Sequence, residues 1–143
     1  MRRLIAAAVF AVAASSMAGA AGIDAGLWKV VTRTETGGVI GPPHESSKCL
    51  TAEQTADLAT TFSPVPNTVN SVCTPIDRHL AGGKLTWRLA CKGQLDMELT
   101  GEFTFDSPHH YSGRVRTKAE MAGMTMVDSQ NMLDGQWLSP CPK

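Results

Sequence analysis

Apolar and polar residues alternate along most of the chain from Gly26 onward. A period of two places successive side chains on opposite faces, which indicates β-strands with one buried face. The clearest example runs from Leu95 to Phe105, where apolar residues alternate with aspartate, glutamate and threonine. The predicted strands cover residues 27–34, 72–80, 84–92, 95–105 and 111–121, with a short strand leading into Cys49 and a last strand from Met124.

One segment departs from this pattern. Thr51 and Gln54 have the spacing of a capping box, in which each side chain satisfies a backbone amide at the start of a helix. We therefore expect one short helix at about residues 52–60. Residues 63–67 contain two prolines and are predicted to be a loop, and Gly82-Gly83 is predicted to form a tight hairpin turn.

Charged residues at alternate positions predict how the strands pair. In an antiparallel hairpin the residue numbers of two directly opposed residues add up to the same value along the whole hairpin. The hairpin around Gly82-Gly83 sets Asp77 opposite Arg88, and loops of three and five residues set the next two hairpins. Opposite charges then face each other across neighbouring strands on one solvated face of the sheet. The two predicted rows are Asp77, Arg88, Glu98 and Lys118, and Lys84, Glu102 and Arg114.

The other face of this sheet is apolar, and one short helix cannot cover it. Strong curvature would bury it at the least cost. We therefore predict an all-β fold, a curved antiparallel meander sheet that closes toward a small barrel or half-barrel, with a β-sandwich as the alternative. The length suits one domain, so residues 21–143 are predicted to form a single β domain.

Residues 1–20 have a different character. A basic start at Arg2 and Arg3 is followed by an uncharged apolar run over residues 4–14 and by the small residues Ala18-Gly19-Ala20. These features are typical of a secretory signal peptide. The apolar run is shorter than the ~20 residues that span a bilayer. We expect an exported protein with no membrane span after cleavage.

The charge balance excludes one class of partner. The chain has 13 Lys+Arg against 13 Asp+Glu, and removal of Arg2 and Arg3 leaves 11 against 13, or −2. Proteins that bind nucleic acid usually carry a basic excess. We therefore expect no nucleic-acid partner, and we expect a monomer.

Four cysteines remain after the predicted cleavage site, and an even number in an exported chain predicts two disulfides. No two of them are closer than 18 positions, which disfavours a zinc site. The predicted registers turn Cys73 outward and Cys91 inward, so a bridge between these two would need a β-bulge. The preferred pairing is therefore Cys49 with Cys73, which would close the loop around the helix, and Cys91 with Cys141.

The chain carries a set of landmarks at Gly26–Val30, Cys49-Leu50-Thr51, Leu85–Cys91, Gly101-Glu102, Tyr111-Ser112-Gly113, Met121–Met132 and Cys141. Together they resemble the domain-of-unknown-function 3617 family of small exported bacterial proteins. The resemblance covers the chain after residue 20 and implies a periplasmic or secreted protein, but it carries no activity and no catalytic residues. Lys29 stands where an acidic residue is expected, and residues 36–43 lack the usual methionines, which weakens a metal site built on two methionine clusters.

Two groups of residues are candidates for a site. Thioether ligands suit Cu(I) in an oxidising compartment, so Met121, Met124, Met126 and Met132 form a candidate metal site, with packing in the core as the alternative. The second group consists of polar residues in the inward phase. Arg78 opposite Trp87, with Asp128 and Gln130 nearby, would orient an anionic or amphipathic ligand, and a polar plug at the barrel mouth is the alternative.

The chain has no motif of a nucleophilic enzyme at recognisable spacing, and His109, His110 and Asp106 are adjacent residues of a predicted turn. We therefore predict a non-enzymatic binding protein without a cofactor. Its partner is expected to be a small apolar or amphipathic ligand or an envelope protein, and copper or other metal handling by the methionines is the alternative. A cavity of several hundred Å³ would favour the ligand, and a filled interior the partner protein.

Overall fold

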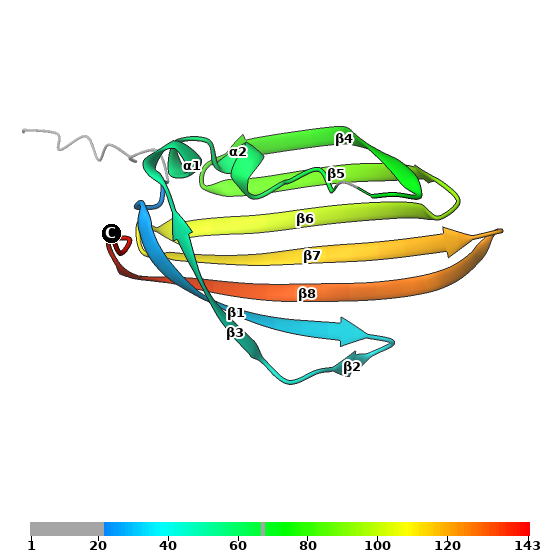
Figure 1. Cartoon of the computed structure of the whole chain (residues 1–143), viewed down its shortest axis with the longest axis horizontal. Coiled ribbons are helices and arrows are strands. Elements are labelled where there is room, and N and C mark those ends of the chain that lie inside the picture. Colours follow the sequence, from blue (N-terminus) through cyan, green and yellow to red (C-terminus); the bar gives the residue numbers. More distant parts are fainter. Residues whose placement is uncertain (1–21, 67) are drawn as a thin grey trace, which may run out of the picture.

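The computed structural model describes residues 22–66 and 68–143. Its strands form one antiparallel sheet in the order β2-β1-β8-β7-β6-β5-β4, with β3 beside β2 on the outer edge of β1 (Figure 1). Among the described residues no pairing joins β3 to β4, so the sheet is a half-barrel, as predicted, and does not close. The strands are β1 (Gly26–Thr36), β2 (Val39–Ile40), β3 (His44–Leu50), β4 (Ser71–Ala81), β5 (Lys84–Gly93), β6 (Asp96–Ser107), β7 (His110–Met121) and β8 (Met124–Ser139).

The predicted helix is present as two short helices, α1 (Ala52–Ala56) and α2 (Leu58–Thr61), at one end of the sheet (Figure 1). The capping box forms as predicted, because the Gln54 amide donates to Thr51 Oγ1 at 3.2 Å and the Thr51 amide donates to Gln54 Oε1 at 2.9 Å. Asp57 separates the helices, and its carboxylate accepts from the Thr60 amide. The helices therefore turn the chain from β3 toward β4.

The second helix brings Phe62 onto the concave face of the sheet. Phe62 lies 4.9–5.2 Å, between ring centroids, from Phe103, Phe105 and Tyr111. Such tilted and edge-on aromatic contacts favour a close-packed cluster. This end of the concave face is therefore filled. The buried apolar core is Ile23, Trp28, Val30, Leu50, Leu58, Phe62, Leu85, Trp87, Leu89, Phe103, Phe105 and Tyr111.

The convex face carries the predicted charges, and most of the predicted register is confirmed. Asp77 pairs with Arg88 across β4 and β5, and Glu98 with Lys118 across β6 and β7. The register between β5 and β6 differs from the predicted one by two residues. Five residues lie between Cys91 and its partner Met97, whereas the predicted loop between the two strands had three. A shift of two keeps every side chain on its predicted face.

The predicted disulfide pairing is wrong. Cys49 bonds to Cys141, and Cys73 bonds to Cys91. The reason is an extra residue in β4, because the register shifts between Pro75 and Asp77 and sets Cys73 directly opposite Cys91. A β-bulge reverses the faces of the residues beyond it. Cys73 therefore faces inward with its partner.

The predicted signal peptide, residues 1–20, lies outside the described residues. Within the part of the chain that the structure describes, no helix has the length and apolar character needed to cross a membrane.

Candidate functional site

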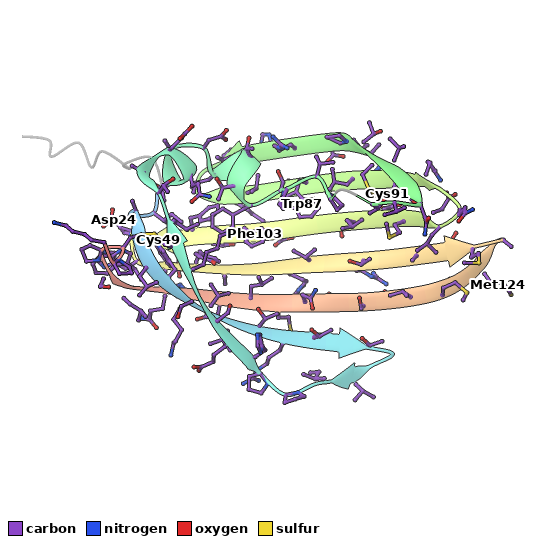
Figure 2. The ribbon with its side chains drawn as sticks, viewed as in Figure 1. Asp24, Cys49, Trp87, Cys91, Phe103 and Met124 are labelled. Atoms are coloured by element: carbon purple, nitrogen blue, oxygen red, sulfur yellow. A yellow bond between two sulfur atoms is a disulfide. The ribbon has the colours of Figure 1, made fainter. Side chains whose placement is uncertain are left out.

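The four methionines of the predicted metal site do not converge. Met121 and Met124 are opposed at the turn between β7 and β8, far from the helices, with Met124 65% exposed (Figure 2). Met132 lies opposite Arg114, on the charged face of the sheet. Met132 is eight positions beyond Met124 along the strand, which is roughly 25 Å at the usual rise per residue. The predicted alternative, packing of these side chains in the core, is also wrong for the exposed Met121, Met124 and Met126.

The predicted polar group is divided between the two faces. Arg78 lies opposite Trp87, as predicted, but Asp128 lies opposite Lys118 and Gln130 opposite Arg116 on the convex face. Ala119 pairs with Val127 while Glu120 pairs with Thr125. Met126 is therefore an extra residue in β8, and it reverses the faces of the strand beyond it.

On the convex face Asp128 has a partner of its own. Arg116 donates to both carboxylate oxygens, from Nε at 3.0 Å and from an amino nitrogen at 2.8 Å. This hydrogen bonding lowers the pKa of Asp128 and raises that of Arg116. Asp128 is thus held as an ion-paired carboxylate that does not face a ligand on the concave side.

The histidine turn is also occupied by protein contacts. His110 lies between two carboxylates, with Nδ1 2.6 Å from Asp106 and Nε2 3.0 Å from Asp134. His109 stacks on Trp137 and contacts Asp24 at 2.9 Å. Both ring nitrogens of His110 are used, and among the described residues no three His, Cys, Asp or Glu side chains are arranged to hold a metal ion.

The concave face contains an open groove of about 450 Å³ that the sequence did not reveal. Its floor is the sheet, one wall is the segment from Phe62 to Pro66 after α2, and the other wall is β3. In Figure 2, Trp87 and Phe103 lie on the neighbouring strands β5 and β6 at this face. The lining residues are Val30, Thr32, Ser46, Lys48, Phe62, Pro64, Pro66, Trp87, Leu99, Phe103, Tyr111, Val115 and Leu133.

Polar groups in the groove are few and stand mainly on its β3 side. Ser46 and Lys48 point to the concave side because they oppose Val30 and Trp28 of β1. Lys48 is the one charged residue among the described residues that line the groove. The groove can therefore hold an apolar group against the floor and a polar or anionic group at the β3 rim.

The floor of the groove includes a buried donor without an acceptor. Trp87 is 4% exposed, and its Nε1 is the one buried side-chain polar atom without a hydrogen-bond partner among residues 22–66 and 68–143. The indole lies over Gly101 of β6. Trp87, which the sequence singled out, is thus part of the groove, whereas its predicted partners Arg78, Asp128 and Gln130 are not among the lining residues.

Sequence reasoning missed Ser46 and Lys48. The segment from His44 to Leu50 is mostly polar and exposed, so its own pattern does not mark an inner face. The alternation of Trp28 and Val30 in β1 was visible, but the register of β3 against β1 was not. That register alone turns the two polar residues toward the concave side.

Comparison with known proteins gives one match. The family model described as "Protein of unknown function (DUF3617)" matches residues 23–141. No curated protein matches the chain, and no solved structure matches it.

Proposed function

Because the chain belongs to the DUF3617 family, whose description assigns no function, we propose from the geometry of the groove that the protein binds a small hydrophobic or amphipathic molecule. The observation that carries the proposal is the groove of about 450 Å³ on the concave face. Ligand sites are typically clefts of ~300–1,000 Å³ with mostly apolar walls and a few polar groups. Exposed apolar surface of this kind commonly marks a site that a ligand or a partner covers.

The proposal includes the compartment. Two disulfides tie the chain, which fits an oxidising environment outside the cytoplasm, and the N-terminal residues have the pattern of a secretory signal. We propose a periplasmic or secreted, non-enzymatic binding protein. N-terminal sequencing of the protein from a periplasmic fraction should find a start near residue 21, and a retained Met1 would contradict export by a cleaved signal.

Binding of the neutral apolar fluorophore N-phenyl-1-naphthylamine tests the groove. We expect its emission to rise on binding and the thermal midpoint of the protein to increase. Val115→Trp places a large side chain in the groove and should weaken binding by about tenfold or more. Val39→Trp on exposed β2 is the control, and equal binding by both variants would place the fluorophore elsewhere.

An envelope protein remains the second candidate partner. The observation that favours it is exposed apolar surface at the strand ends far from the helices, where Val39, Met121 and Met124 are exposed. Cross-linking in intact cells from a photoreactive residue at position 124 would capture such a partner, with position 104 on the convex face as the control.

A further inference from the structure

We infer that the ligand is an anionic single-chain amphiphile whose head group binds at Lys48, an inference that rests on the proposed function. Lys48 is the one charged residue among the described residues that line the groove. An apolar trough with a single cation at its rim is complementary to a molecule with one anionic end and one apolar end.

The position of Lys48 leaves its charge available to a ligand. Its Cα partner in β1 is Trp28, so it shares the concave side with the core. Among the described residues no carboxylate lies within 4.0 Å of its Nζ, whereas Lys29, on the opposite face of β1, contacts Glu45 at 3.9 Å. Lys29 and Lys48 lie on neighbouring strands, but Lys29 contacts a carboxylate whereas Lys48 faces the concave side.

Hydroxyl groups accompany the lysine at the same rim. Ser46 precedes Lys48 by two residues in β3 and lies opposite Val30, and Thr32 follows on the same face of β1. A carboxylate or a phosphate accepts hydrogen bonds from ammonium and hydroxyl groups alike. This side of the groove therefore suits an anionic head, and it holds no acidic side chain among the described lining residues.

The opposite side of the groove suits a tail. Phe62, Pro64 and Pro66 face the floor formed by Trp87 and Leu99, which belong to β5 and β6 on the far side of the sheet from β3. A chain that starts at Lys48 therefore crosses the concave face and ends against the indole of Trp87. This orientation assigns head and tail to named residues and makes the inference testable.

The experiment measures binding of dodecanoate, dodecyl phosphate and neutral 1-dodecanol to the purified protein by displacement of N-phenyl-1-naphthylamine. We expect both anions to bind more tightly than the alcohol. Lys48→Gln should weaken binding of the anions by about twofold to fivefold and leave binding of the alcohol unchanged. Lys29→Gln, the matched control on the other face, should change neither. The carboxylate and phosphate arms show which head group is preferred.

Quenching of tryptophan emission tests the orientation. Trp28 lies opposite Lys48, so a bromine beside the carboxylate should quench Trp28 and a bromine at the tail end of dodecanoate should quench Trp87. Trp87→Phe should therefore remove most of the quenching by the tail-end bromine and little of the quenching by the head-end bromine. Equal affinity for alcohol and anions, unchanged by Lys48→Gln, would overturn the head-group assignment and leave the proposed function standing. Loss of the head-end quenching, rather than of the tail-end quenching, in Trp87→Phe would overturn the orientation. Binding of none of these probes would overturn both the inference and the proposed function.

Discussion

Three glycines on successive strands each lie beneath an aromatic ring of the strand before. Gly101 lies opposite Trp87, Gly113 opposite Phe103 and Gly135 opposite Tyr111. A Cβ on any of the three would overlap the ring that covers it. Glycine under an aromatic ring allows backbone and ring to approach closely and the sheet to curve. The close packing of the concave face thus requires glycine at these three positions as well as the large aromatic side chains.

Gly101→Ala should therefore destabilise the protein. The new methyl group would displace the indole of Trp87, and overpacking of this kind typically costs ~1–3 kcal/mol. Urea unfolding followed by circular dichroism measures the loss. Gly41→Ala is the control, since its Cβ would meet only the Thr34 carbonyl at 3.5 Å. Equal stability of the two variants would contradict this account of the concave face.

His110 makes stability depend on pH. Hydrogen bonds to Asp134 and Asp106 raise the pKa of His110 above its ordinary 6.5, and the bond to His110 lowers the pKa of Asp106 below its ordinary 3.8. A raised pKa in the folded state stabilises below pH 6.5 and loses this effect as pH rises through the raised value. The lowered carboxyl pKa stabilises above pH 3.8 and loses its effect as pH falls through the lowered value. The pairing of His110 with Asp106 therefore contributes most to the unfolding free energy between about pH 3.8 and about pH 6.5.

His110→Gln should be less stable than the wild type at pH 5.5, and the difference should shrink as pH rises toward about 9, because the wild type loses its proton. Urea midpoints measured across this range check the prediction. A difference that stays constant with pH would mean that the charge of His110 contributes nothing.

At the scale of elements, single extra residues and two disulfides arrange the strands. The extra residue between Pro75 and Asp77 brings Cys73 to Cys91 within one hairpin. Cys49, at the end of β3, is bonded to Cys141 after β8. The first bond closes a local loop of 18 residues and the second a loop of 92. The second also ties the strand that carries Lys48 to the C-terminal segment.

Removal of the Cys49–Cys141 bond should loosen β3. We expect the double variant Cys49→Ala, Cys141→Ala to lose ~2–4 kcal/mol of unfolding free energy and to exchange the amide hydrogens of residues 44–50 faster. Hydrogen exchange with mass spectrometry reads these peptides directly. The double variant Cys73→Ala, Cys91→Ala is the comparison and should leave the exchange of residues 44–50 nearly unchanged. Equal protection of β3 in both variants would contradict this role.

For the whole molecule, the two faces of the sheet contribute differently to stability. The concave face buries Leu89 and the aromatic cluster, whereas the convex face carries ion pairs such as Arg88 with Asp77 at 3.6 Å and Lys84 with Glu102 at 3.0 Å. Both partners of each pair are more than half exposed, and exposed pairs contribute little because water and salt screen them. The apolar face therefore supplies most of the stability.

Salt should accordingly have a small effect. Raising KCl from about 0.05 M to about 0.5 M should change the unfolding free energy by less than about 1 kcal/mol, whereas Leu89→Ala should cost ~2–5 kcal/mol. Thermal and urea unfolding measure both. A larger loss in salt than in the variant would show that the convex charges dominate.

The faces of most strands could be predicted because alternation is a local property. Leu99 and Glu98 face the sides that their neighbours in β6 predict. The errors arose at Ile76 and Met126, because each is an extra residue that the sequence does not mark and that reverses the faces of the strand residues beyond it. The groove was missed for a related reason, since Lys48 belongs to a polar segment whose inner face exists only through pairing with β1.

The sequence by itself determined the class of fold, the polar convex and apolar concave faces, and the start of the helices, because side-chain alternation and capping act over a few residues. The tertiary structure decided the bulges, the cysteine partners and the groove. These depend on which distant strands meet and in which register, and a shift of one residue there turns a side chain from one face of the sheet to the other.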